Sequence, residues 1–123
     1  MAKGDDIQER MIGLAAAVVT FCGTLPKGTA GSHIGTQLLR SGTSPAPNYA
    51  EARGAESDRN FVHKLRIVLK ELNETEVWLQ ILTRTQTISA DSVQPMRDEC
   101  TALAPIITAS IRTMKRRGVT AAG

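Results

Sequence analysis

The 123-residue sequence is poor in aromatic side chains, which make up 3% of it, and this scarcity limits how a core can be built. There is one tryptophan, one tyrosine and two phenylalanines, whereas 41% of the residues are hydrophobic. Aliphatic side chains and alanine must therefore fill the core of a single domain. Charged residues make up 22%, close to the average for soluble proteins, which argues against a disordered acidic tail or a histone-like polycation.

No run of apolar residues is long enough to span a membrane. The richest run, Ile12 to Phe21, has about half of the roughly 18 to 20 residues that a membrane helix needs, so we expect a buried helix there and no membrane partner. Asp5, Asp6 and Glu9 precede that run, which is the wrong polarity for a secretory signal. A cytoplasmic location is therefore expected.

The chain has only two cysteines and two histidines, and their spacing matches no familiar metal motif. Cys22 and Cys100 lie far apart, so we expect two reduced thiols, with a disulfide as the less favoured alternative. Neither His33 nor His63 follows a glutamate by three residues, as the di-metal sites of four-helix bundles require. The sequence predicts no metal site and no other cofactor.

Signals for catalysis are also missing. No glycine-rich elbow surrounds a serine or cysteine nucleophile, and no histidine is placed beside one by sequence. The glycines between residues 23 and 35 are not preceded by a strand or followed by a Gly-Lys-Ser or Gly-Lys-Thr step, so they do not form a P-loop. We expect no catalytic residues; an enzyme with a cryptic pocket between helices is the least favoured alternative.

Helical periodicity is the main signal that the sequence does contain. In four stretches, apolar residues recur at alternating steps of four and three, which lays one apolar stripe along a helix. Four amphipathic helices with short connections predict an all-α fold in one domain, residues 1–123, arranged as an antiparallel up-down-up-down four-helix bundle. The expected helices span residues 5–24, 31–54, 57–85 and 92–117.

Prolines and surplus apolar residues modify this simple bundle. Pro45 and Pro47 predict a kink or a break within the second helix, with a loop as the alternative, and Pro105 predicts a bend in the fourth. The third helix carries apolar residues outside its main stripe, so it needs more than one neighbour, and we expect part of this surface to be buried in an oligomer. These residues are Val62, Ile67, Val77, Trp78 and Ile81.

Two runs of the sequence resemble a known family. They are SGTSPAPNYAEA at Ser41 to Ala52 and FVHKLRIVLKELNETEVWL at Phe61 to Leu79. Both are similar to the bacterial four helix bundle protein family, which includes the intervening-sequence proteins encoded inside large-subunit ribosomal RNA genes and is related to the accessory variability determinant of diversity-generating retroelements. The residues that match in order and spacing are Arg40, Ser44, Asn48, Glu51, Phe61, Leu65, Leu69, Glu71, Glu74 and Trp78.

The resemblance implies an up-down bundle that assembles with itself into a homopentamer, and it does not imply an enzyme. For the retroelement relatives it also implies a basic surface that meets RNA or DNA and a reverse-transcriptase-like protein partner. We therefore expect a homo-oligomeric scaffold with nucleic acid as its leading partner. The competing hypothesis is an interaction module for another protein encoded nearby, without nucleic-acid binding.

A polar face on the second helix is expected to be structural. Its four residues advance at steps of four, four and three, so they share one side of the helix. An arginine that faces the interior needs a carboxylate partner, because either charge left alone there costs several kcal/mol. We expect Arg40 to pair with Glu51 in an interior network that includes Ser44 and Asn48, with ligand binding by this face as the alternative.

Charge placement is the one functional signal, although the net charge is only +3. In an up-down bundle, the basic residues near the start of the first and third helices and the end of the second and fourth gather at one end. This end would attract the phosphate backbone without reading bases, whereas the simpler interpretation is solubility and complementation of helix dipoles. The candidate nucleic-acid-binding residues are Arg53, Lys64, Arg66, Lys70, Arg112, Lys115, Arg116 and Arg117.

Aromatic stacking on single-stranded bases is not expected. Such binding needs aromatic side chains beside the cations. Tyr49 and Trp78 are remote in sequence from the basic run that begins at Lys115. The sequence therefore predicts binding that is electrostatic and steeply dependent on salt.

Overall fold

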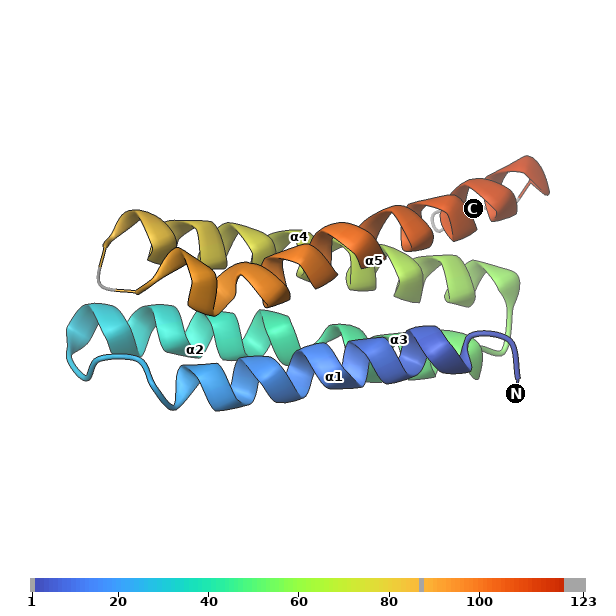
Figure 1. The fold of residues 1–123 in the computed structure, drawn as a ribbon. Coiled ribbons are helices and arrows are strands. Elements are labelled where there is room, and N and C mark those ends of the chain that lie inside the picture. The colour runs from blue at the N-terminus through green and yellow to red at the C-terminus, as the bar shows by residue number, and fades with distance from the viewer. Residues whose placement is uncertain (1, 87, 119–123) are drawn as a thin grey trace.

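The computed structural model describes residues 2–86 and 88–118, and the regular structure in these two ranges is entirely helical. Helices α2 and α3 follow one another along a single arm, so the chain forms four arms that run alternately up and down (Figure 1). The predicted all-α four-helix bundle is confirmed. The helices are α1 (Asp5–Cys22), α2 (Thr29–Thr43), α3 (Pro45–Arg53), α4 (Asp58–Arg84) and α5 (Ala90–Arg116).

The second arm is broken at Ser44, as its prolines predict. Pro45 is the first residue of α3, and Pro47 lies in the same first turn. Proline is tolerated there because the first backbone N–H groups of a helix have no partner within that helix. The chain therefore makes two helices in line, joined at one residue, and the alternative of a loop in this stretch is wrong.

Serine side chains cap the starts of α4 and α5. Ser57 Oγ accepts a hydrogen bond of 3.1 Å from the backbone N–H of Asn60 and begins α4. Ser89 Oγ accepts one of 3.2 Å from the backbone N–H of Asp91 and begins α5. Helix α5 continues through Pro105 without interruption and slants across α4 (Figure 1). Each cap satisfies a backbone donor that has no partner inside the helix.

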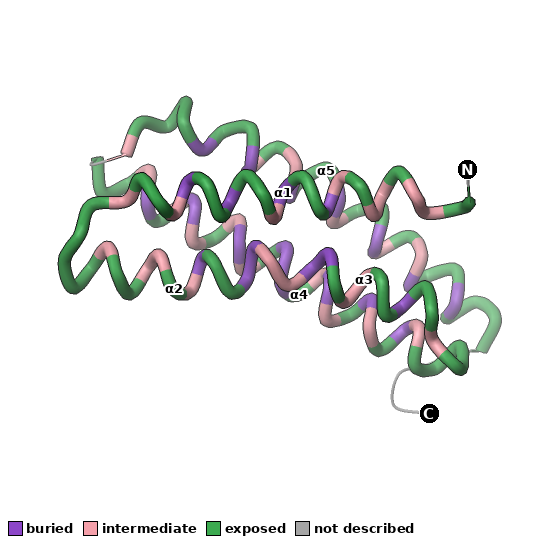
Figure 2. The backbone as a smooth tube through the Cα atoms, turned by 90° about the horizontal axis from the view of Figure 1, so that it is seen from below, coloured by how far each residue is buried: buried purple, intermediate pink, exposed green. Residues whose placement is uncertain are grey.

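The core is aliphatic, as the scarcity of aromatics requires. Buried residues form stripes that face the centre of the bundle (Figure 2), and Phe21 is the one aromatic side chain among the buried residues of the described ranges. Helix α4 packs against α2, α3 and α5, so it does have several neighbours. Val62 is fully buried and belongs to this core, which makes the prediction that it lies on an oligomer surface wrong.

Both cysteines are free thiols. Cys100 is buried in the core and Cys22 is half-buried beside it, so the prediction of reduced thiols is confirmed. Burial raises the pKa of the Cys100 thiol to about 12, and the negative charges of Glu76 and Glu99 act in the same direction. Of the helices in the described ranges, none combines the length and the apolar character needed to cross a membrane.

Candidate functional site

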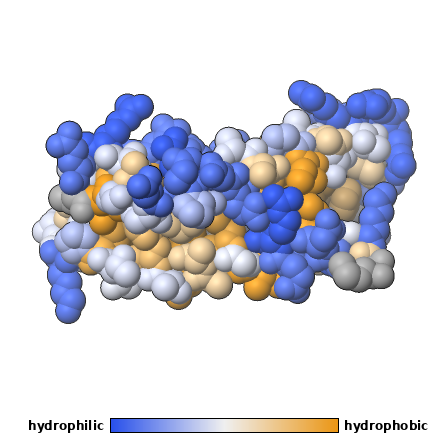
Figure 3. Space-filling view, viewed as in Figure 1, coloured by the Kyte–Doolittle hydropathy of each residue, from blue (hydrophilic) through white to orange (hydrophobic). Residues whose placement is uncertain are grey.

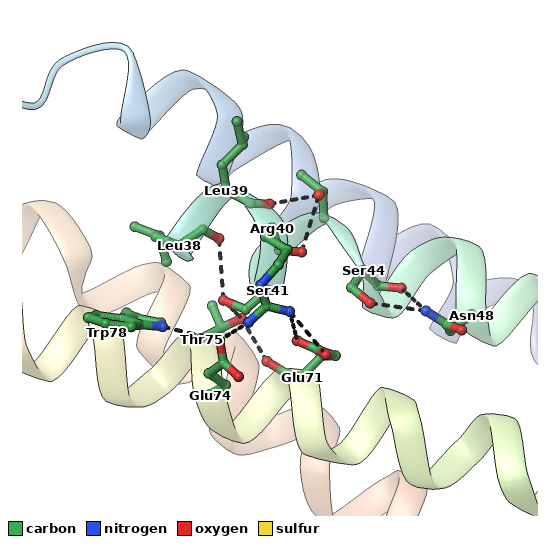
Figure 4. A network of polar contacts seen from close by, with 11 residues as sticks. Leu38, Leu39, Arg40, Ser41, Ser44, Asn48, Glu71, Glu74, Thr75 and Trp78 are labelled. Carbon is green, nitrogen blue, oxygen red and sulfur yellow. Dashed lines mark hydrogen bonds and ion pairs between the residues drawn. The ribbon is translucent and has the colours of Figure 1, made fainter. Parts of the chain in front are cut away.

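A small polar contact joins α2 to α4 in the middle of the core (Figure 4). Ser41 and Thr75 are both fully buried, and Thr75 Oγ1 lies 3.0 Å from Ser41 Oγ and 2.7 Å from the carbonyl oxygen of Glu71. Ser41 Oγ in turn donates to the carbonyl oxygen of Leu38 at 3.4 Å. Buried polar groups are costly unless they are hydrogen-bonded, so this contact fixes how α2 sits against α4.

Arg40 joins the same two helices next to this contact, at the surface of the bundle. Its Nη1 donates to both carboxylate oxygens of Glu71, at 3.0 and 3.2 Å, and its Nη2 donates to Glu74 Oε2 (Figure 4). The Glu71 side chain is only 7% exposed, whereas that of Arg40 is 48% exposed. Trp78 Nε1 donates to Glu74 Oε2 at 3.2 Å. One arginine therefore neutralises two carboxylates on α4, one of which is nearly buried.

The predicted pairing of Arg40 with Glu51 is wrong. Glu51 lies on α3, its side chain is 60% exposed, and its Oε2 is 3.0 Å from Lys64 Nζ. Ser44 and Asn48 do contact each other, because Asn48 Nδ2 donates to Ser44 Oγ at 3.0 Å, but they stand apart from the Arg40 cluster (Figure 4). The break at Ser44 separates Arg40 on α2 from Asn48 and Glu51 on α3, so the four residues form three separate contacts.

The basic ends of the helices do gather, as the topology predicts. Figure 1 shows the start of α1, the connection from α3 to α4 and the end of α5 at one end of the bundle. Two of the cations there are paired: Arg53 Nη2 lies 2.6 Å from Asp5 Oδ1, and Lys64 pairs with Glu51. We call this end the basic pole and define it by Lys3, Arg53, Lys64, Lys115, Arg116 and Arg117.

Three candidates, Arg66, Lys70 and Arg112, lie outside the basic pole as defined above. Lys70 is about 18 Å along α4 from Asp58, at about 1.5 Å per residue, and Arg66 precedes it by one turn on the same exposed side. Arg112 borders a groove of about 860 Å³ between α4 and α5. Within the ranges that the structure covers, six of the eight candidates make no ion pair. They are Arg66, Lys70, Arg112, Lys115, Arg116 and Arg117.

The basic pole contains a cavity of about 480 Å³, called here the polar cavity. Four segments surround it: the chain before α1, helix α3, the start of α4 and the end of α5. The lining side chains include three cations, two aromatic rings and a methionine, and no described carboxylate belongs to the lining. The six are Lys3, Arg53, Arg117, Tyr49, Phe61 and Met114.

Arg53 and Gly4 shape one wall of this cavity. Arg53 Nη2 donates to the carbonyl oxygen of Lys3 at 3.2 Å as well as to Asp5, and this side-chain hydrogen bond lowers the pKa of Asp5. A Cβ atom at Gly4 would lie only 2.9 Å from Tyr49 Oη, and the φ of Gly4 is +91°, a conformation that favours glycine. The turn before α1 is therefore held closely against α3.

The polar cavity corrects one expectation. Tyr49 and Arg117 line the same space, so the prediction that no aromatic side chain accompanies the basic C-terminal run is wrong. Sequence reasoning also missed Phe61 as a partner of that run, whereas the up-down topology had already placed Lys3, near the start of the first helix, at this end of the bundle. No spacing signal could have found Phe61, because the four segments around the cavity meet only through the packing of the bundle.

Six large apolar side chains are exposed among the residues that the structure describes. Ile12 and Val19 lie seven residues apart on one side of α1, and Val77 and Ile81 lie four apart on α4. Leu39 on α2 and Ile106 on α5 complete the set. Figure 3 shows apolar side chains exposed between hydrophilic ones on the face that α1 and α5 present, most of them along its lower middle.

Among the residues that the structure describes, no three His, Cys, Asp or Glu side chains come together in a group that could hold a metal ion. Several charged side chains instead form ion pairs between helices. Arg10 and Glu99 join α1 to α5 at 2.6 Å, and Arg97 and Glu76 join α5 to α4 at 2.6 Å. These contacts connect neighbouring helices. The polar cavity, in contrast, brings three cations and two aromatic rings together.

Comparison with known proteins agrees with this architecture. No match was found among curated proteins. A similar solved structure is the crystal structure, at 1.70 Å resolution, of a protein with unknown function from the S23 ribosomal protein family of Bacteroides thetaiotaomicron; the two chains share 32% identity and a TM-score of 0.82, over 90% of this chain and 99% of that one. Residues 4–109 match the 23S rRNA-intervening sequence protein family. This match covers most of the bundle, and the chain therefore belongs to the 23S rRNA-intervening sequence protein family.

Proposed function

We propose that the protein is a non-enzymatic homo-oligomeric scaffold, a pentamer by family resemblance, whose basic pole binds RNA or DNA through phosphate contacts. The observation that carries this proposal is the gathering of cations at one end of the bundle. Lys115 and Arg116 are exposed there, and neither forms an ion pair with a described residue. Cations of this kind are free to replace the counterions of a phosphate backbone.

Self-assembly is supported by the exposed apolar side chains. Val77 is 52% exposed and Ile81 39% exposed on the outer side of α4, and Val19 is 53% exposed on α1. Burial of apolar surface contributes about 25 cal/mol per Å², so contacts between such faces favour a stable oligomer. A symmetric ring of subunits would also bring several basic poles together and increase the attraction for a polyanion.

The test of nucleic-acid binding is a polarisation titration of the intact protein with duplex DNA and duplex RNA at about 50 mM salt. We expect affinity that falls steeply as salt rises and varies little with sequence. Lys115→Gln with Arg116→Gln should weaken binding and reduce the slope against salt. Lys27→Gln with Arg84→Gln removes the same charge from the opposite end and serves as the matched control. Absence of binding by the intact oligomer would overturn the proposal.

The second candidate function is an interaction module for another protein, and the groove between α4 and α5 favours it. This groove of about 860 Å³ is bordered by Val77, Pro105 and Arg112, which offer apolar surface and a charge side by side. Under this alternative, the oligomer would form but would bind no duplex at low salt. The titration above therefore separates the two functions.

A further inference from the structure

The polar cavity combines two kinds of surface that a phosphate-contact mechanism does not need. A polyanion held by its backbone requires only exposed cations. Here Tyr49 and Phe61, both half-buried, lie in the same space as Lys3 and Arg117. Aromatic rings offer a face on which a flat ring can stack, and cations attract an anion. A ligand that suits both surfaces carries a flat ring and a negative group in one small molecule or one residue of a polymer.

We propose that the polar cavity binds a single unpaired nucleotide, with its base against the rings of Tyr49 and Phe61 and its phosphate toward Lys3, Arg53 and Arg117. This inference deepens the proposed function and rests on it in one respect, since both require the basic pole to attract phosphate. It adds a binding site for one nucleotide to a surface that otherwise contacts only the phosphate backbone of a nucleic acid.

The donors of Arg53 are arranged for such a phosphate. Its guanidinium has five N–H groups, and the hydrogen bonds to Asp5 and to the backbone of Lys3 both come from Nη2. Within the described residues, Nε and Nη1 make no hydrogen bond, so they remain for a ligand. Asp5 thus orients the guanidinium while it neutralises only part of the local positive charge, because Lys3 and Arg117 also line the cavity.

The size of the cavity selects an unpaired nucleotide. A volume of about 480 Å³ lies within the range of small-ligand pockets and far below the size of a duplex. Burial raises the pKa of Tyr49 above its ordinary value, so its hydroxyl stays protonated at neutral pH and can donate to a base or a ribose. A base that is still paired cannot enter such a space without leaving its stack. The ligand is therefore a free nucleotide or the unpaired end of a strand.

The test is calorimetric titration of the full chain with adenosine 5′-monophosphate at about 50 mM salt, with adenosine and inorganic phosphate titrated separately. We expect saturable binding of the nucleotide at one site per chain, and at least about tenfold weaker binding of adenosine or phosphate alone. Arg117→Gln and Phe61→Leu should each weaken nucleotide binding about tenfold. Arg84→Gln, which removes one charge from the opposite end of the bundle, should stay within about twofold of the unaltered protein.

Three results would overturn the pocket. They are the absence of saturable nucleotide binding, an equal loss in the Arg84 and Arg117 variants, and equal affinity for phosphate alone. Thermal melting of each variant checks that the bundle is intact, and the Arg117 variant keeps the test valid if the Phe61 variant unfolds. Duplex binding is measured on the same samples, so duplex binding without nucleotide binding rejects the pocket alone, and loss of both rejects the proposed function as well.

A competition experiment distinguishes the two sources of the nucleotide. Short single strands with a 5′-phosphate, and the same strands with a 5′-hydroxyl, are titrated against bound adenosine 5′-monophosphate. Displacement by the phosphorylated strand at a lower concentration than by the hydroxyl strand identifies a strand end as the ligand. Displacement by neither strand identifies a free nucleotide, and in both cases the cavity is a nucleotide site.

Discussion

Arg40 shows how a single side chain can hold two helices in register. It is half exposed, yet it neutralises Glu71, whose side chain is only 7% exposed. Removing a partner from a buried charge costs more than removing one from an exposed charge. The two ends of this ion pair are therefore unequal in their contribution to stability, and the arginine is the end whose loss matters more.

We expect Arg40→Met to lower the free energy of unfolding by about 2 to 4 kcal/mol, because it leaves the Glu71 carboxylate buried without its partner. Urea unfolding followed by circular dichroism measures this change. Glu51→Ala is the matched control, and we expect a loss of about 0 to 1 kcal/mol there, since the Glu51 side chain is 60% exposed. Adding Glu71→Gln to the Arg40 variant should restore part of the loss; no restoration would contradict this account.

Cys100 gives the stability of the fold a dependence on alkaline pH. Its pKa is about 12 in the folded protein, against the ordinary thiol value of 9.0. Between these values the unfolded chain has lost the thiol proton while the folded chain keeps it, so stability is full below about pH 9 and declines as pH rises toward 12.

This decline should be measurable as the change in unfolding free energy between about pH 8 and pH 10. We expect the unaltered protein to lose more stability over this interval than Cys100→Ala, because the variant lacks the thiol while it shares every other titrating group. Equal losses in the two proteins would show that the thiol is not shifted as the structure implies.

The pairings themselves were not predictable from the sequence. Spacing placed Arg40 and Glu51 on one face of a helix, but it did not say at what height each would meet α4. In the structure, Arg40 pairs with Glu71 and Glu51 pairs with Lys64, and these two partners lie about two turns apart on α4. Rotation and relative height of helices are set by packing of the whole core, which a one-dimensional pattern does not contain.

Helix positions, in contrast, were predictable to within two residues at each end. The apolar period of α4 and α5 determines which side is buried, and Ser57 and Ser89 determine where these helices begin. The break in the second arm also followed from Pro45, since its ring removes a backbone donor. Elements are predictable here because their causes are local.

The contact between α1 and α2 depends on a close approach at Gly42. A Cβ atom there would lie 2.7 and 2.8 Å from the two methyl carbons of Val18, which is fully buried. Val18 is β-branched and has little freedom to move aside. A side chain at position 42 would therefore push the two helices apart.

We expect Gly42→Ala to lower the free energy of unfolding by about 1 kcal/mol or more, because overpacking outweighs the gain in helix propensity. Gly13→Ala is the control: it also lies inside a helix, but no heavy atom lies within 4 Å of its added Cβ. That variant should gain about 0.5 to 1 kcal/mol. Thermal melting of both proteins tests the pair, and a stabilised Gly42 variant would contradict the close approach.

At the scale of the whole molecule, the sequence predicted the basic pole but not the polar cavity. The up-down order of four amphipathic arms was enough to bring the helix ends together. The cavity needs Lys3, Tyr49, Phe61 and Arg117 to meet in three dimensions, and these residues come from four different segments. Their meeting depends on the angles between helices, which have no signature in spacing.

If the protein self-associates as proposed, charge introduced on the outer side of α4 should weaken the oligomer. Val77→Asp with Ile81→Asp should reduce the mass measured by light scattering toward the 13.2 kDa of one chain. The helical circular dichroism should remain, since these side chains are 52% and 39% exposed and contribute little to the core. An unchanged mass would place the contact between subunits on another face.

Both ends of the described chain lie at the end of the bundle that carries the basic pole (Figure 1). Lys3 and Arg117 line the polar cavity, so an affinity tag or a fluorescent protein attached next to either residue would lie close to that cavity. Such a fusion would crowd the very surface that a binding assay is meant to measure. The turn between α1 and α2, near Lys27 at the far end of the molecule, is the better place for a label or for attachment to a sensor surface.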